Sequence, residues 1–220
     1  MADIIIFGLE QFAAQMFELL KQESEMNVRA FCADKDYMPE KIDWGGVPVV
    51  AFEDLERYFA PTEHSILFCI GYTQMNRIRK KRMEEAMARG YSIAGYRHPT
   101  ALIQTEDIGI GNIFMEGVVI GQGVRIGDGN IFWPAAHVAH HTWVGNYNFF
   151  TISTAVAGNI RIHDFCVFGA NCTVKNGIEI KDGTLAGAGA YIAHSTEEWS
   201  VYTPPRSYQL KGKSSLDFKL

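Results

Sequence analysis

The second half of the chain carries an apolar residue at every sixth position. The series runs without interruption through Leu102, Ile108, Phe114, Ile120, Ile126, Phe132, Val138, Val144, Phe150, Val156, Ile162, Phe168, Val174, Ile180, Ala186 and Ile192. A 3.6-residue helix cannot hold a spacing of six on one stripe. The pattern instead indicates a β-solenoid, in which each sextet forms one short strand and a corner, and stacked coils bury a continuous apolar column.

Small residues often follow these apolar positions, as at Gly109, Gly121 and Gly145. Small residues suit tight corners between strands. Three sextets would complete one triangular coil, and strands of neighbouring coils would stack ~4.8 Å apart. A repetitive antiparallel β-sandwich is the alternative, but its loops would break the sixfold register. We therefore expect a parallel β-helix over residues 99–194, followed by a C-terminal tail over 195–220.

Residues 1–98 alternate short apolar runs with helical patterns. Strands are expected at residues 4–7, 28–34, 47–52 and 65–71, and helices at 11–22, 54–59 and 75–90. This alternation predicts a small Rossmann-like parallel α/β domain with helices on both faces. On the last helix, Arg77, Arg79 and Lys80 are expected on a solvated charged face, with phosphate contacts as the alternative.

Composition narrows the class of protein. With 47% hydrophobic and 20% charged residues, the 220-residue chain is expected to fold compactly. A net charge of -5 without a basic run argues against nucleic acid or an anionic membrane as main partner. We find neither a signal peptide nor a membrane span and expect a cytoplasmic protein. The four dispersed cysteines are interpreted as reduced, buried thiols.

Ligands of parallel α/β sheets collect at the carboxyl ends of the strands, which here are residues 8–11, 34–36 and 71–73. The first turn reads GLEQFA and lacks the GxGxxG fingerprint, so NAD is not predicted. A glycine at this turn is either structural or lets backbone amides approach a phosphate. This crevice is the expected site for a nucleotide-linked sugar.

Three histidines fall in one sextet, HVAHHT at residues 137–142. Because Val138 points inward, His137 should point outward, and His140 and His141 should lie at the following corner. A histidine with an unperturbed pKa of ~6.5 can accept a proton from an amine or hydroxyl at neutral pH. A purely structural role is one alternative. A metal site is another, but residues so close along one strand do not converge easily on one ion, and none is predicted.

A small α/β domain followed by a hexapeptide repeat resembles the sugar O- and N-acyltransferases of the sialic-acid and bacillosamine type. The resemblance spans nearly the whole chain and implies a left-handed parallel β-helix, a homotrimer and acyl-CoA bound between neighbouring subunits. It also implies acetylation of a nucleotide-linked sugar at an amine or a hydroxyl.

The same resemblance assigns catalytic residues. It implies that His140 is the general base, with His141 in the place where several relatives carry an acidic residue. A second histidine found in some relatives is replaced here by Phe149, and Phe12 stands where many members have a histidine in the first turn.

For the sugar, the resemblance implies contacts from residues of the crevice and the histidine strand. Asp34 is expected to face the base or ribose, with Asp36 as an equal candidate. A GYTQMN run is similar to a motif in one branch of the family. The expected substrate contacts are Gly8, Glu10, Gln11, Asp34, Gly71, Tyr72, Asn76 and His137.

For acetyl-CoA, the resemblance implies that the pantetheine arm lies at the small-residue corners of the later coils. The expected contacts are Gly169, Ala170, Gly187 and Ala188, although tight solenoid corners explain the same residues equally well. In the basic tail, Arg206, with Lys211 and Lys213, either meets the CoA phosphates or caps the open end. No covalent intermediate is needed, so Cys166 and Cys172 are interpreted as core residues.

The first hypothesis is acetyl-CoA-dependent N-acetylation of a 4-amino-4,6-dideoxy sugar. O-acetylation is the second, and nothing in the residues separates the two. A third is a catalytically silent β-helix that only binds nucleotide sugar or acts as a scaffold. The HVAHHT cluster favours an enzyme.

Overall fold

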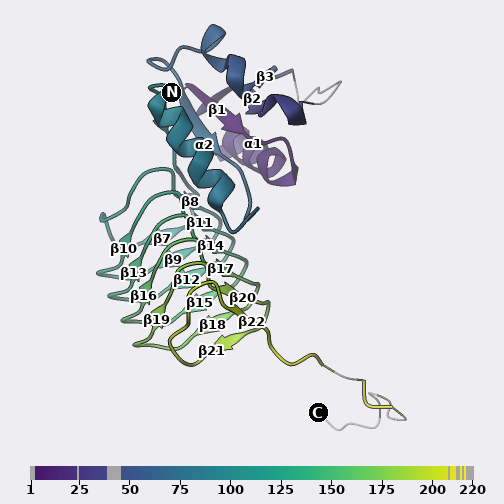
Figure 1. Ribbon diagram of the computed structural model, residues 1–220, viewed down its shortest axis with the longest axis vertical. Helices are drawn as coiled ribbons and strands as arrows, with labels where there is room; N and C mark the ends of the chain where they lie inside the picture. The colour runs from purple at the N-terminus through teal and green to yellow at the C-terminus, as the bar shows by residue number, and fades with distance from the viewer. Residues whose placement is uncertain are drawn as a thin grey trace.

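The computed structural model describes residues 3–23, 25–38, 46–207, 209–211, 214 and 216. Lys213 of the basic tail lies outside the described residues. Figure 1 shows an α/β unit at the top of the view and, below it, a stack of triangular coils that leads into the C-terminal tail.

The N-terminal unit is a five-stranded parallel sheet with strand order β3-β2-β1-β4-β5. The strands are β1 (Asp3–Phe7), β2 (Asn27–Ala33), β3 (Val49–Ala51), β4 (Ser65–Phe68) and β5 (Ser92–Ile93). The helices are α1 (Gln11–Glu23) and α2 (Arg77–Ala88), with short 3-10 helices η1 (Lys35–Tyr37) and η2 (Phe52–Arg57). The short helix expected over 54–59 is therefore a 3-10 helix that begins two residues earlier.

Alternation along β1 places its apolar residues on both faces of the sheet. Ile4 and Ile6 share a core with Met16 of α1. Ile5 shares the opposite core with Met83 of α2. The two helices thus cover opposite faces of the sheet.

The coils form three parallel sheets, which we call sheets I, II and III. Sheet I contains β6 (Tyr96–Arg97), β8 (Ile113–Phe114), β11 (Ile131–Phe132), β14 (Phe149–Phe150), β17 (Val167–Phe168), β20 (Leu185–Ala186) and β22 (Val201–Tyr202). Sheet II contains β7 (Leu102–Ile103), β9 (Val119–Ile120), β12 (His137–Val138), β15 (Ala155–Val156), β18 (Thr173–Val174) and β21 (Tyr191–Ile192). Sheet III contains β10 (Arg125–Ile126), β13 (Trp143–Val144), β16 (Arg161–Ile162) and β19 (Glu179–Ile180).

The sixfold apolar residues fill the inside of this β-helix. Four phenylalanines on successive coils stack with nearly parallel rings: the centroid distances are 4.9 Å for Phe114 and Phe132, 4.6 Å for Phe132 and Phe150, and 4.8 Å for Phe150 and Phe168. These spacings match the distance between hydrogen-bonded strands. The predicted parallel solenoid is confirmed.

The register of the first coil differs from the prediction. Leu102 is 55% exposed, and Ile103 is the residue that points inward. Ile103 pairs with Ile120, so this coil is one residue shorter than the coil that joins Ile120 to Val138. The pairing of β6 with β8 and of β22 with β20 also extends the ladder beyond residues 99–194 at both ends.

Buried asparagines line the inside of the corner between sheets III and I. Asn130 donates from Nδ2 to the Asn112 side chain at 3.1 Å and to the Gly145 carbonyl at 2.9 Å. Its Oδ1 accepts from the Asn148 backbone N–H at 2.9 Å. Each coil therefore satisfies backbone groups of the next, as buried polar groups require.

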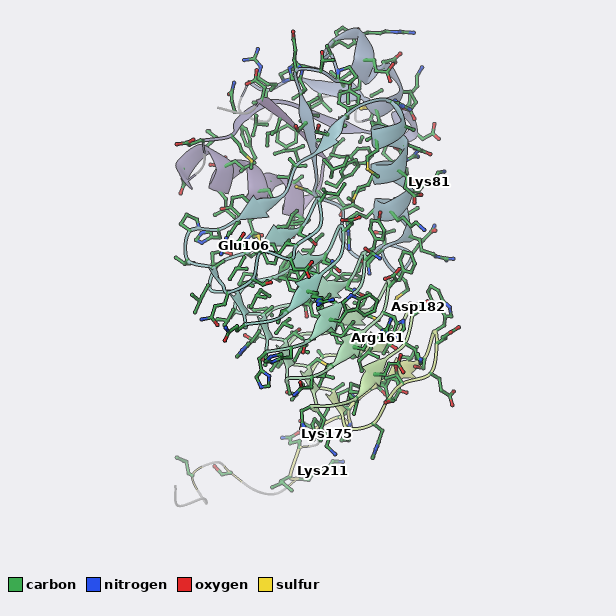
Figure 2. All side chains as sticks on the ribbon, turned by 90° about the vertical axis from the view of Figure 1, so that its left-hand side faces the viewer. Lys81, Glu106, Arg161, Lys175, Asp182 and Lys211 are labelled. Atoms are coloured by element: carbon green, nitrogen blue, oxygen red, sulfur yellow. The ribbon has the colours of Figure 1, made fainter. Side chains whose placement is uncertain are left out.

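The α/β unit packs directly on sheet I. Phe12 and Met16 of α1 share a core with Ile113, Ile131 and Phe149 of that sheet. Figure 2 shows Lys81 on α2 above Asp182, which lies on a later coil along the same side of the molecule.

One basic residue of α2 is buried at this junction, contrary to expectation. Arg79 is 1% exposed and donates to the carbonyls of Gly129 (2.9 Å), Gly71 (3.0 Å) and Asn148 (3.2 Å). Burial lowers the pKa of Arg79 to about 9, an effect that nearby Tyr147 partly offsets. The predicted solvated face therefore holds for Arg77, which is exposed, but is wrong for Arg79.

Candidate active site

The histidine cluster lies at the corner between sheets II and III, and its three side chains are exposed. His137 points outward from β12, whereas His140 and His141 form the corner itself. His141 adopts the left-handed conformation, with φ of 55°, that recurs at the corners. Its ring lies edge-on to that of His140, and the two Nδ1 atoms lie 3.1 Å apart.

Each of these two rings lies over a glycine of a neighbouring coil. A Cβ atom on Gly158 would come within 2.6 to 3.0 Å of three atoms of the His140 ring. A Cβ on Gly123 would approach the His141 ring to 3.2 Å. We did not identify Gly158 from the sequence, although a signal was present. At intervals of one coil, the equivalent positions carry polar side chains, Gln122, Asn176 and His194, and Gly158 has none.

A groove runs from His141 onto the outer face of sheet III. Trp143, Arg125 and Arg161 line it. The Arg161 guanidinium lies 4.4 Å from the centroid of Trp143, and Arg125 pairs with Asp107 at 3.4 Å. Arg161 is labelled on the β-helix in Figure 2. The surface beside the histidine pair is therefore cationic and partly aromatic.

The ends of β1, β2 and β4 meet at one edge of the N-terminal sheet. The backbone N–H of Gly8 donates to the Cys32 carbonyl at 2.9 Å, and the backbone N–H of Cys69 donates to the Phe7 carbonyl at 2.8 Å. Gly8 has φ of 134°, and a Cβ there would lie 2.7 Å from the Cys69 carbonyl oxygen. Close approach of the two strand ends thus explains this glycine. Glu10 and Gln11 are exposed beside it, at the start of α1.

Asp34 follows β2 at the same edge and binds Arg82 of α2. Both contacts, at 2.6 and 3.1 Å, use Oδ2 of the carboxylate. Arg82 also bonds to Glu85. Oδ1 of Asp34 is buried, with no hydrogen-bond partner among the described residues. Asp36, the equal candidate, is exposed on η1. Arg82 was missed because its sequence position does not show that it reaches Asp34.

The loop after β4 joins the crevice to the β-helix. The Gly71 carbonyl is held by Arg79, and a Cβ at Gly71 would meet nothing within 4 Å. Tyr72 is 56% exposed, and its ring lies edge-on to Phe149 at 5.3 Å. Asn76 is fully buried and donates to the Cys166 carbonyl at 3.3 Å, while its Oδ1 has no partner among the described residues.

Aromatic residues continue this surface along sheet I. Trp133 lies 5.9 Å from Phe149 and 5.8 Å from Phe12, measured between ring centroids. Two of these three rings, Phe12 and Phe149, are buried. This edge of the crevice is consequently apolar.

The small-residue corners lie between sheets I and II. A Cβ on Gly169 would come within 2.4 Å of the Ala188 nitrogen, so coil stacking alone requires this glycine. Gly187 is less crowded, with its nearest neighbour at 3.2 Å. Ala170 is half-buried and Ala188 exposed, and Arg206 is exposed in the segment after β22.

The four cysteines are free and buried, as expected. Burial raises the pKa of both Cys166 and Cys172 to about 12. A thiolate nucleophile is therefore disfavoured at either position.

The α/β unit packs on sheet I, whereas the histidine corner lies between sheets II and III, which is the corner that sheet I does not form. Within the described parts of the chain, no hydrogen bond or ring contact connects His140 or His141 to the α/β unit.

The described parts of the chain also contain no group of three His, Cys, Asp or Glu side chains arranged to hold a metal ion. Among the described helices, none has the length and apolar character needed to cross a membrane.

Comparison with known proteins gives matches at the level of structure only. No protein-family model matches the chain, and no curated protein sequence does. The acetyltransferase domain of PglB from Neisseria gonorrhoeae superposes with a TM-score of 0.77 at 22% identity, over 93% of this chain and 100% of that one. The same domain has also been solved in complex with acetyl coenzyme A.

Two further structures extend the comparison. PerB from Caulobacter crescentus, solved with CoA and GDP-perosamine, gives a TM-score of 0.78 at 25% identity, over 91% of this chain and 93% of that one. WeeI from Acinetobacter baumannii gives 0.68 at 18% identity, over 91% and 96%. The fold is thus that of the left-handed β-helix, hexapeptide-repeat acyltransferases. Within that class, the neighbours that match along nearly the whole chain include sugar N-acetyltransferases.

Proposed function

We propose that the protein is an acetyl-CoA-dependent N-acetyltransferase that acts on a nucleotide-linked 4-amino-4,6-dideoxy sugar. The observation that carries the proposal is the match, along more than 90% of both chains, to PerB, whose structure holds CoA and GDP-perosamine. The exposed histidine pair adds a group able to accept a proton. A scaffold that only binds sugar would not need it.

In this proposal His140 is the general base. It accepts the proton that the amine loses as the amine nitrogen bonds to the acetyl carbon and the thioester C–S bond breaks. Such positioned proton transfer typically contributes ~10²- to 10⁴-fold in rate. The thiols of Cys166 and Cys172 take no part, since both are buried and their pKa values are raised.

The α/β unit is proposed to be a Rossmann-like nucleotide-sugar domain. Its strand order places Gly8, Asp34 and Gly71 at one edge, where such sheets bind ligands. Oδ1 of Asp34 is buried and has no partner among the described residues, and we assign it as the acceptor for a ribose hydroxyl or a base N–H. The remaining proposed sugar contacts are Glu10, Gln11, Tyr72 and His137, whereas Asn76 is fully buried and is not proposed as a direct contact.

The corner between sheets I and II is proposed to hold the pantetheine arm of acetyl-CoA. Small side chains at Gly169, Ala170, Gly187 and Ala188 permit close approach of an extended chain. Arg206, in the following segment, would meet the CoA phosphates.

A homotrimer is proposed because the α/β unit packs on sheet I and the histidines lie at the corner between sheets II and III, so that a neighbouring copy would bring the two together. We place the enzyme in the cytoplasm. Static light scattering at micromolar concentration should give three times 24.6 kDa. A monomer that acetylates sugar would contradict the shared site.

The function is tested by release of free CoA thiol with a panel of nucleotide-linked sugars. Turnover should require a 4-amino group and should yield an amide in the product. Acetylation of the matching 4-hydroxy sugars would instead identify an O-acetyltransferase. Tight sugar binding without thiol release would identify the scaffold.

A further inference from the structure

The contact between His140 and His141 restricts where their protons lie. An imidazole nitrogen either donates or accepts, so two Nδ1 atoms 3.1 Å apart can share only one proton. If His140 donates, its Nε2 is left with a lone pair and can act as a base. If His141 donates, His140 carries its proton on Nε2 and cannot.

Cationic side chains line the groove beside the pair. The groove that starts at His141 is lined by Arg125 and Arg161, and Arg125 pairs with Asp107. Doubly protonated rings would break the shared hydrogen bond and place two cations in contact. The pair therefore suits a single proton-accepting position.

The His140 ring also lies directly over Gly158 of the next coil. The edge of the ring that carries Nδ1, Cε1 and Nε2 lies over this glycine at the distances given above. Gly158 does not have a positive φ, so its backbone conformation does not call for glycine. Because other coils carry Gln122, Asn176 or His194 at this place, coil stacking does not require glycine here either. The ring is what leaves no room for a side chain.

We propose that His141 and Gly158 are positioning residues for His140: neutral His141 accepts at Nδ1 and so keeps the lone pair of His140 on Nε2, while Gly158 provides the space in which the ring lies. This inference rests on the proposed acetyl transfer. It assigns an imidazole to the task of orienting the base, with no carboxylate taking part.

Two substitutions of His141 separate an acceptor from mere bulk. Asn places an oxygen near the position of Nδ1, so His141→Asn should keep turnover within about fivefold of the native value. Phe fills similar space without an acceptor, so His141→Phe should lower kcat by about tenfold or more with little change in either KM. Equal turnover of the two variants would overturn the role of His141.

Gly158 has a matched control in the same column of the repeat. Gly158→Ala should lower kcat by about tenfold or more, because its Cβ displaces the ring and covers Nε2. Asn176→Ala, at an exposed position two coils from His140, should leave kcat unchanged. Native turnover of Gly158→Ala would overturn the role of the glycine.

Nitrogen NMR of protein labelled with ¹⁵N-histidine tests the pair without any assay. His140 should show a protonated Nδ1 and a bare Nε2 at pH 7.5, and His141→Phe should abolish this preference. A proton on Nε2 of His140 in the native protein would overturn the inference. If NMR gives the expected tautomer but no sugar is acetylated, the proposed function fails while the geometry of the pair stands.

Discussion

Two corners of the same β-helix hold polar residues in opposite ways. At the corner between sheets III and I, Asn112, Asn130 and Asn148 are buried and bonded to neighbouring coils. At the corner between sheets II and III, His140 and His141 are exposed, and their side chains form a hydrogen bond with each other. Both corners obey the same repeat.

The difference separates stability from chemistry. A buried amide that satisfies backbone groups contributes to folding, and its loss leaves unpaired partners in the core. An exposed ring pair contributes little to folding, because water can replace its contacts. The comparison therefore predicts that substitutions at the two corners change different measured quantities.

The largest expected effect is on turnover at the histidine corner. His140→Ala should lower kcat by ~10²-fold or more with little change in CoA affinity, as expected for an interaction made mainly in the transition state. Its thermal midpoint should match that of the native protein. Steady-state kinetics and calorimetry on the same preparation check both, and a variant that loses stability along with activity would erase the contrast.

The asparagine corner should respond in the reverse sense. Asn130→Ala removes the partners of the Asn148 N–H and the Gly145 carbonyl, at a cost of about 2 kcal/mol. The thermal midpoint should fall by about 4–8 °C. Turnover of the folded variant should stay native. An Asn130→Ala protein as stable as its parent would mean that the ladder is dispensable.

A smaller effect is expected in the crevice, where one oxygen of Asp34 binds Arg82 and the other is buried without a partner among the described residues. Asp34→Ala should raise the KM for the nucleotide sugar about tenfold, or about 1.4 kcal/mol, and leave the KM for acetyl-CoA nearly unchanged. Asp36→Ala separates the two candidates, since Asp36 is exposed on η1 at the same edge: it should leave this KM unchanged, and a tenfold rise would assign the contact to Asp36 instead. Equal changes in both Michaelis constants would place the nucleotide elsewhere.

The repeat was predictable because each coil places an apolar residue inward at a fixed spacing, and that requirement is visible in one dimension. Leu102 is the exception. In the first coil, pairing with β9 places Ile103 opposite Ile120, one residue later than the sixfold spacing predicts. The long-range contacts were not predictable. Arg79 was predicted on a charged helix face because its sequence neighbours are charged. The carbonyls that accept its hydrogen bonds come from coils about 50 and 70 residues away, which the local sequence does not show.

The site divides in the same way. The histidines were visible in the sequence because three of them fall in one sextet of a repeat that is otherwise rich in apolar and small residues. Their exposure followed from the alternation of inward and outward side chains. Gly158 and Arg82 were not identified, because their importance depends on which ring or carboxylate lies against them.

The most direct test of the proposed acetyl transfer is a crystal structure of the protein with CoA and a nucleotide-linked 4-amino sugar. The account predicts the nucleotide at the carboxyl edge of the α/β sheet, near Asp34, and the amino group within ~3 Å of Nε2 of a His140. That histidine should belong to a neighbouring subunit. A sugar amine bound away from every His140, with both ligands fully occupied, would contradict it.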